Sequence, residues 1–171
     1  MRSRRQLNRS RFLMRLGRYP EATAALDAAR LIAAGTGNQD ASYKTLLAWV
    51  HLTDSEMALS QLRFNEAIAK GQIALDLATK QKIRDIACPA KYTIALAQAS
   101  SNNAPSALRL CEEAVAIAKE VKSPRLISSA LLAQAQVLLR RKDARGALEK
   151  ATESQPLSHA IRTLPGSYCG P

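Results

Sequence analysis

Small apolar residues recur along the chain at the spacing of amphipathic helices. The segment 64–78 reads FNEAIAKGQIALDLA, and a similar segment, 104–118, reads APSALRLCEEAVAIA. Three alanines of each segment align, forty residues apart: Ala67, Ala74 and Ala78 with Ala107, Ala114 and Ala118. A phrase that recurs at a fixed interval of this length predicts a structural repeat.

The repeated segment occurs four times in the chain. It begins at Ala22, Ala67, Ala107 and Ala147, and a small residue follows seven positions later each time, at Ala29, Ala74, Ala114 and Ser154. Residues at i and i+7 lie on one helix face, and two small residues there allow another helix to approach closely. Larger apolar residues are expected to fill the stripe beside them, at Leu26, Ile73, Leu110 and Leu148.

Apolar-rich stretches of helical length separate these four segments, and turn signals separate the stretches. Ser123-Pro124, for example, places an N-cap residue before a proline at the first helical position. Eight helices are predicted, in four pairs over 3–34, 41–81, 85–121 and 124–155, followed by an irregular C-terminal tail over 156–171. Pro89 predicts that the third pair starts late or kinks.

Helix pairs at a period of 20–50 residues are typical of solenoids. The expected fold is therefore all-α, a right-handed solenoid of four helix-turn-helix repeats within residues 1–155. The alternative is an ordinary bundle of alanine-rich helices that look alike because they are amphipathic. The phase match at four sites favours the solenoid.

The repeated segment resembles the tetratricopeptide repeat family. Residues 17–22, GRYPEA, are similar to that family's turn and second-helix opening, and the match continues at the alanines of the later segments. The period of 40 is longer than the family's usual ~34 residues and resembles the longer-helix variant found in the sensor arms of large bacterial regulators. The family's first-helix glycine is replaced by Ser55, Ala95 and Ala135.

Composition limits the compartment and the core. The chain is 47% apolar but only 4% aromatic, so its core must consist of aliphatic residues and alanine. No apolar run approaches the ~20 residues that cross a bilayer. The cysteines, Cys88, Cys111 and Cys169, are odd in number and lack a metal-ligand spacing, which fits a reducing, cytoplasmic location.

The net charge of +11 is concentrated at the N-terminus. Seven arginines and no acidic residue occupy the first twenty positions. They indicate contact with nucleic acid or acidic lipid, or else a basic solvated helix face or a join to an upstream segment. No aromatic residues interleave for base stacking, and an organelle-targeting helix is disfavoured because these residues complete the first repeat.

Signatures of catalysis are sparse. His51 and His159 have no second ligand at helical or loop spacing, and Cys111 is expected to be a small core residue. Glu112 and Glu113 are adjacent, so they point about 100° apart on a helix and cannot form an acid–base pair. The sequence therefore predicts no enzyme, no cofactor and no metal site.

The resemblance implies a concave groove lined by the first helix of each pair. Such grooves bind peptides or helices. The implied lining residues are Arg4, Asn8, Arg11, Trp49, Leu52, Glu56, Tyr92, Thr93, Leu96, Leu132, Gln136 and Arg140. Trp49 is the only tryptophan; it is either a binding hot spot or a residue that packs between pairs.

These features predict a non-catalytic protein–protein interaction module, an adaptor or sensor segment of a larger bacterial signalling or transcription-regulatory protein. The alternative is a basic repeat module that binds nucleic acid or another polyanion. The face with Leu139, Leu148 and Ala151 has no evident cap. It therefore predicts that the chain either belongs to a longer array or self-associates end to end.

Overall fold

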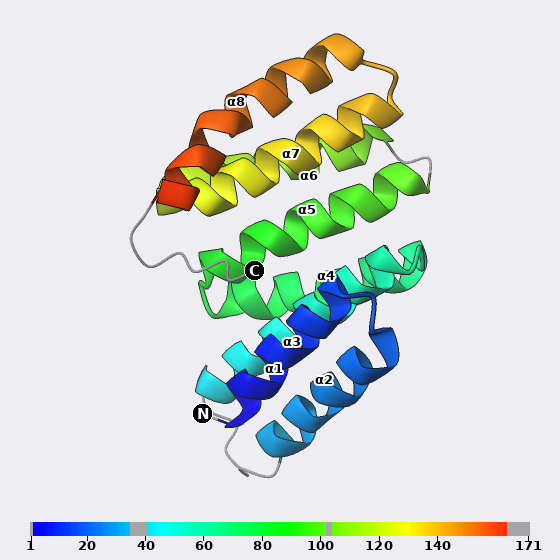
Figure 1. Ribbon diagram of the computed structural model, residues 1–171, viewed down its shortest axis with the longest axis vertical. Coiled ribbons are helices and arrows are strands. Elements are labelled where there is room, and N and C mark those ends of the chain that lie inside the picture. Colours follow the sequence, from blue (N-terminus) through cyan, green and yellow to red (C-terminus); the bar gives the residue numbers. More distant parts are fainter. Residues whose placement is uncertain (1, 35–40, 102–103, 164–171) are drawn as a thin grey trace.

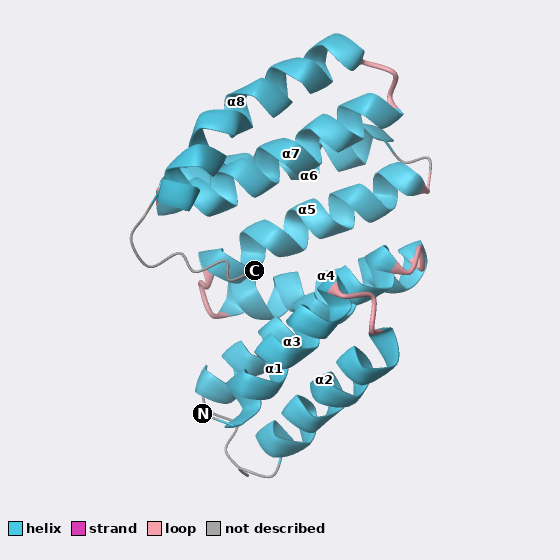
Figure 2. Ribbon diagram, viewed as in Figure 1, coloured by secondary structure: helices cyan, strands magenta, loops and turns pink. Residues whose placement is uncertain are grey.

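Eight helices make up the part of the chain that the computed structural model describes, residues 2–34, 41–101 and 104–163 (Figure 1). Within those ranges Figure 2 shows helices and loops and no strand. The helices are α1 Arg2–Arg15, α2 Tyr19–Ala34, α3 Ala41–Ser60, α4 Phe64–Lys80, α5 Arg84–Ser100, α6 Ala104–Val121, α7 Pro124–Arg140 and α8 Ala144–Thr163. The expected order of eight helices is confirmed.

Each helix pair packs only against its neighbours in sequence. The two helices of each pair contact one another, and the first helices form a continuous row in the order α1, α3, α5, α7. The second helix of each pair also contacts the first helix of the next, as α4 does with α5. Among the described helices no contact joins non-adjacent pairs. This nearest-neighbour packing is that of a solenoid, so the alternative of an ordinary bundle is wrong.

The small residues of the repeat lie at helix–helix contacts. All eight are at most 3% exposed: Ala22, Ala29, Ala67, Ala74, Ala107, Ala114, Ala147 and Ser154. Gly71, four residues after Ala67, shows how close the helices come. A Cβ there would lie 2.6 Å from Cγ1 of Ile94 in α5 and 2.9 Å from Oγ of Ser55 in α3. The predicted role of the small residues is confirmed.

The larger residues beside them follow a different rule from the one expected. Leu26 is fully buried, but Ile73 and Leu148 are exposed, so their expected place in the buried stripe is wrong. The reason is their phase, because these two residues do not stand four positions after the aligned alanine as Leu26 does. The residues that do stand there are Leu26, Gly71, Cys111 and Ala151.

Five helices end in the same backbone motif. The residue one or two positions after each of these helices is left-handed, with φ between 55° and 72°, at Gly17, Leu62, Lys82, Lys122 and Lys142. After α4, for instance, the Lys82 N–H donates to the Thr79 carbonyl at 3.1 Å and the Ile83 N–H to the Ala78 carbonyl at 2.8 Å. These two bonds define a Schellman motif. It fixes the chain reversal at half-repeat intervals of twenty residues, as between Lys122 and Lys142.

Two prolines lie inside helices. Pro89 is buried in α5, which starts at Arg84, so of the two expected effects the late start is wrong and the kink stays a prediction. Pro156 lies in α8, which continues to Thr163, so an irregular tail beginning at residue 156 is also wrong. A proline removes one backbone hydrogen bond and crowds one carbonyl, and in a long helix the bonds on either side persist. Expectations for residues 164–171 fall outside the described residues.

Enlarging a buried alanine of the repeat should destabilise the protein. Leucine at Ala107, which is fully buried, would overpack the pair interface and cost roughly 1–3 kcal/mol in the free energy of unfolding. Ala116 lies on the same helix but is exposed, so Ala116→Leu is the matched control and should be nearly neutral. Urea denaturation followed by circular dichroism measures both variants, and equal midpoints would show that the repeat register is wrong.

Relieving a left-handed lysine should stabilise the protein. Lysine carries a Cβ that disfavours positive φ and glycine does not, so Lys82→Gly is expected to raise the free energy of unfolding by about 0.5–1 kcal/mol. Lys70→Gly, in the middle of α4, should lower it by roughly 1 kcal/mol. Thermal melts compare the two variants, and a loss of stability in Lys82→Gly would contradict the assigned turn.

Candidate partner-binding groove

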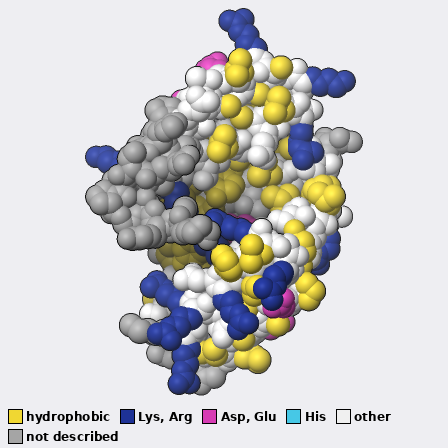
Figure 3. Space-filling model, viewed as in Figure 1, with side chains coloured by type: hydrophobic (Ala, Val, Ile, Leu, Met, Phe, Trp, Pro, Cys, Tyr) yellow, Lys and Arg dark blue, Asp and Glu magenta, His cyan; other side chains and the backbone are white. Residues whose placement is uncertain are grey.

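The row of first helices presents one side of each helix to solvent. The view in Figure 1 looks onto this row, with α6 behind α7. Figure 3 shows the same face hollowed between α1 and α5, with hydrophobic and basic side chains around the hollow. We refer to this concave surface, made by α1, α3, α5 and α7, as the groove.

Side chains of α1 and α3 meet at the N-terminal half of the groove. The Arg11 guanidinium of α1 donates to both carboxylate oxygens of Glu56 on α3, at 3.2 Å each. Its carbon also lies 5.2 Å from the centroid of the Trp49 ring, a cation–π geometry. The Arg11 and Glu56 side chains are 32% and 18% exposed, so water screens their interaction less than on an open surface.

Tyr92 of α5 lies within the electrostatic field of this pair. Burial raises the pKa of the Tyr92 hydroxyl above its usual range, the negative charge of Glu56 adds to the rise, and Arg11 opposes it. Tyr92 therefore stays a neutral hydroxyl at physiological pH. Arg11, Trp49 and Glu56 are thus in contact, and Tyr92 on the next first helix is close enough to be influenced by the charges of Arg11 and Glu56.

One position of the repeat runs along the groove from end to end. Aligned by the repeat interval, its four residues are Arg11, Glu56, Leu96 and Gln136. The first three are half-buried and Gln136 is exposed. The same repeat position is thus a cation in the first pair, an anion in the second, an aliphatic chain in the third and an amide in the fourth. Such variety contrasts with the uniformly small residues at the buried positions, and it shows that packing does not dictate this position.

A second row lies one turn further along each helix. It consists of Arg15, Ser60, Ser100 and Arg140, each four residues after a member of the first row and exposed or half-buried. Only Arg140 was predicted from the sequence. The forty-residue alignment could have identified the other three, because a helix face continues at i+4. Arg4, also predicted, is exposed and aligns with Trp49.

Four of the predicted groove residues lie elsewhere. Leu52 and Thr93 are buried, so their placement in the groove lining is wrong. Their helix faces are covered by the neighbouring pairs, which the periodicity of one helix alone does not reveal. Asn8 and Leu132 are exposed, but Asn8 aligns with the buried Thr53 and Thr93, and Leu132 aligns with the buried Leu52 and the half-buried Tyr92, which a following pair covers at least in part. Both therefore belong to the two ends of the array.

Trp49 has a clear packing role. Its ring is half-buried and contacts two core clusters, one with α1 and α2 and the other with α4 and α5. The expectation that it packs between pairs is confirmed. The solvent-facing side of the ring carries the Arg11 guanidinium, so a partner would meet the two side chains as one unit. A role in binding stays a prediction.

The described cysteines and histidine show no activated group. Cys88 and Cys111 are buried, and burial raises the pKa of each thiol to about 12, which makes the thiolate scarce. The core placement expected for Cys111 is confirmed. Burial lowers the pKa of His51, whose Nδ1 has no hydrogen-bond partner. Among the described residues no group of three or more His, Cys, Asp or Glu could hold a metal ion.

The N-terminal arginines divide into two groups. Arg11 and Arg18 form ion pairs, with Glu56 and Glu21 respectively. The others are exposed, and no acidic side chain of the described chain pairs with them: Arg2, Arg4, Arg5, Arg9 and Arg15. This part of α1 is a solvated cationic surface.

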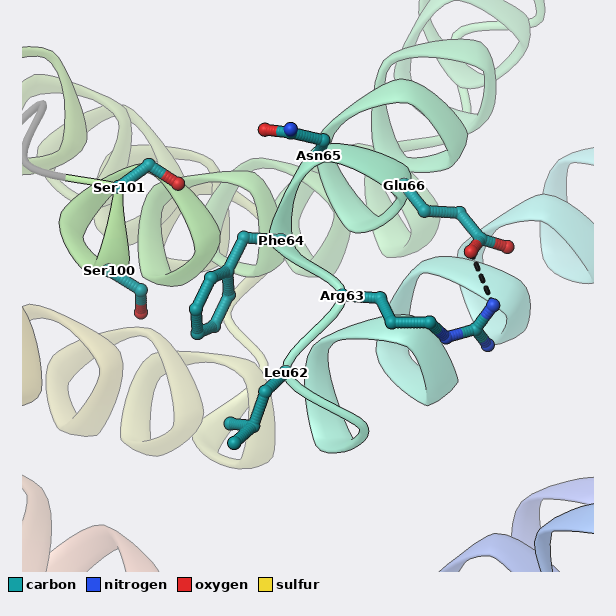
Figure 4. Close-up of a pocket in the computed structure, with 7 residues that line it drawn as sticks. All are labelled: Leu62, Arg63, Phe64, Asn65, Glu66, Ser100 and Ser101. Carbon is teal, nitrogen blue, oxygen red and sulfur yellow. Dashed lines mark hydrogen bonds and ion pairs between the residues drawn. The ribbon is translucent and has the colours of Figure 1, made fainter.

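A pocket of about 490 Å³ lies between two pairs. Its walls are the turn and first residues of α4, Leu62 to Glu66, and the end of α5, Ser100 and Ser101 (Figure 4). The Phe64 ring points into the space between the turn and α5, and Arg63 pairs with Glu66. The pocket marks where the end of a first helix meets the turn of the preceding pair.

Comparison with known proteins identifies the fold. No family model and no curated protein matches the sequence. Among solved structures, aspartyl phosphate phosphatase F from Bacillus subtilis matches with a TM-score of 0.75 and 16% identity over 96% of this chain. The chain spans 43% of that protein's length. The fold is accordingly an all-helical, tetratricopeptide-like repeat. No described helix is long and apolar enough to cross a membrane.

The Arg11–Glu56 pair should be energetically coupled and should influence the Trp49 environment. Arg11→Ala uncovers one face of the indole, so its fluorescence should shift to longer wavelength. A double-mutant cycle with Glu56→Gln should give a coupling of roughly 0.5–1 kcal/mol. Arg4→Ala, which removes an exposed arginine of the same helix, is the control. Unchanged emission in Arg11→Ala, with zero coupling, would contradict the geometry.

Proposed function

We propose that this chain is a non-catalytic protein-interaction module that holds a peptide or helix of a partner protein in the groove. The observation that carries the proposal is the row Arg11, Glu56, Leu96 and Gln136, where one repeat position differs chemically in every pair while the buried positions stay small. Interior packing explains the small residues but not this variety. A surface that contacts a different side chain of a partner at each repeat would require such variety.

The two aromatic side chains Trp49 and Tyr92 support the same function. Trp49 and Tyr92 are held by core packing at the side of the groove, so they lose little side-chain freedom when a partner binds. Rigid aromatic groups beside a charged pair are typical of binding hot spots. The fold also agrees, since helical-pair solenoids bind ligands along their concave surface.

We further propose a regulatory context for the module. The repeat interval of forty residues resembles the longer-helix variant of the sensor arms of bacterial regulators. A sensor or adaptor segment of a larger bacterial signalling protein is the context that this resemblance supports, in the cytoplasm. The phosphatase named above shares the fold, and at 16% identity its activity is not part of the proposal.

The second candidate function is binding of a polyanion such as nucleic acid. The five exposed, unpaired arginines of α1 favour it. Phosphate contacts of this kind weaken steeply between low and physiological salt, whereas a peptide held by apolar contacts in the groove responds little. Salt dependence therefore separates the two functions.

Site-specific crosslinking tests the groove. A photoreactive amino acid replaces Gln136 in the groove or, as control, Ile73, which is exposed on the second helix α4. Position 136 is expected to capture one polypeptide at physiological salt, and position 73 is not. Leu96→Glu should reduce capture at least about tenfold through loss of an apolar contact, whereas Ile73→Glu should leave it unchanged.

Circular dichroism shows whether Leu96→Glu stays folded, and Ser60→Lys provides a second variant at an exposed site of the second row. Equal capture from both positions, or capture insensitive to both groove variants, would reject the groove. Nuclease-sensitive crosslinks at low salt that disappear at physiological salt would support the polyanion function instead.

A further inference from the structure

The last helix pair exposes an apolar surface that no other helix of the described chain covers. We refer to Leu132 and Leu139 of α7 and Leu148 of α8 as the end face. Their exposed fractions are 43%, 59% and 70%. Figure 3 shows hydrophobic side chains spread along α7 and α8 on the upper part of the molecule. The sequence predicted no cap for the face with Leu139, Leu148 and Ala151; Leu139 and Leu148 are exposed, and Ala151 is half-buried.

The same repeat positions are covered in the earlier pairs. Leu132 aligns with Leu7, Leu52 and Tyr92, and Leu139 with Met14, Leu59 and Ala99, all buried or half-buried. In those pairs the row of first helices continues, so the next first helix covers these positions. The end face is therefore one half of an interface that the fold builds three times elsewhere.

The contacts made by the residues that align with Leu148 indicate which residues a helix packed on the end face must carry. The aligned residues each contact one position of the next first helix: Ile68 packs with Ala97, Leu108 packs in a cluster with Val137, and the Thr23 hydroxyl contacts Met57 Sδ at 3.7 Å. Met57, Ala97 and Val137 are themselves one repeat position. Seven residues before each of them stand Val50, Ala90 and Ala130, all buried. A helix with small or aliphatic residues at i and i+7 fits the end face.

Basic residues beside the end face favour a partner helix that carries negative charge. Arg141, Lys142 and Arg145 are exposed at the α7–α8 turn, and none forms an ion pair within the described chain. The acidic residue among them, Asp143, already accepts the Gly146 N–H through its carboxylate at 2.9 Å, as a cap of α8. The turn is therefore a cationic border of the apolar surface.

The pocket in Figure 4 gives the orientation. There the end of α5, Ser100 and Ser101, lies against the turn that starts α4. The aligned turn of the last pair spans residues 142–146, so the C-terminal end of an added helix would lie against Lys142 and Arg145. A helix C-terminus carries partial negative charge, and acidic side chains in its last turn would add to the attraction.

A second copy of the chain fits this surface poorly. The opposite end of the array carries Arg5, Arg9 and Phe12, which align with Val50, Asp54 and Met57. Head-to-tail stacking would bury Arg5 where a valine is fully buried, at a high cost for an unpaired charge. Tail-to-tail pairing would bring two cationic turns toward each other. The acid-poor end faces thus disfavour self-association.

We propose that the end face docks an amphipathic helix of another protein, with small aliphatic residues at i and i+7 and acidic residues in its last turn. The helix lies parallel to α7 and takes the place of a further first helix. This site is distinct from the groove and does not depend on it.

A designed peptide tests the proposal. The labelled probe carries residues 123–140 of this chain, whose Ala130 and Val137 supply the i and i+7 contacts, with Gln136→Glu, Leu139→Glu and Arg140→Glu in the last turn. A control peptide carries lysine at those three positions. Fluorescence anisotropy with the full chain should show binding of the acidic peptide at least about tenfold tighter than that of the basic one.

Protein variants locate the site. Leu148→Glu and Leu139→Glu should each weaken the acidic peptide about tenfold or more, whereas Leu31→Glu, at an equally exposed leucine of α2, should not. The double variant Lys142→Glu, Arg145→Glu should reverse the peptide preference. Leu96→Glu should leave peptide binding intact, which separates this site from the proposed groove.

Three outcomes would overturn the proposal: no binding of the acidic peptide, binding that Leu31→Glu weakens as much as Leu148→Glu does, or binding that ignores the charge of the last turn. Sedimentation velocity over a concentration series adds a fourth. Self-association of the parent chain that Leu148→Glu abolishes would make a second copy the occupant.

Discussion

Close approach of neighbouring helices is the constraint on which the structure depends. At Gly71 the backbone of α4 comes so near to α3 and α5 that even a methyl group would collide with Ile94 and Ser55. The buried alanines extend this condition along the array, because each occupies a contact where a larger side chain would push two helices apart. With few aromatic residues in the chain, the stability must come from many such short contacts rather than from a few large side chains.

Because helices approach closely only on some of their faces, the residues allowed at a repeat position depend on what that position faces. Where a repeat position faces a neighbouring helix, its residues are small or aliphatic, as at Val50, Ala90 and Ala130. Where a position faces the groove, charge, amide and aliphatic chain alternate. The ends of the array expose positions of the first kind. In the first pair they carry arginines, which water solvates, and in the last described pair they carry leucines, which no other described helix covers.

The helices and the four small pairs could be predicted from the sequence because both are local or periodic signals. The alanine phrase gives the register, and the turn residues set the boundaries to within a residue or two for most helices. The groove was harder. Leu52 and Thr93 share the periodicity of the groove face, yet helices of the neighbouring pairs cover them, and coverage depends on contacts distant in sequence. The Arg11–Glu56 contact joins residues 45 positions apart, so no local pattern could have paired them.

Removal of the last helix pair tests the central claim, that each pair is stabilised by its neighbours through one repeated interface. A chain ending at Lys122 keeps α1 to α6 and should remain helical, with a lower midpoint of thermal unfolding by circular dichroism, because one interface and one pair are lost. The signal per residue should stay near that of the full chain. Loss of the helical signal in the shortened chain would show that all four pairs share a single core, and would contradict the account.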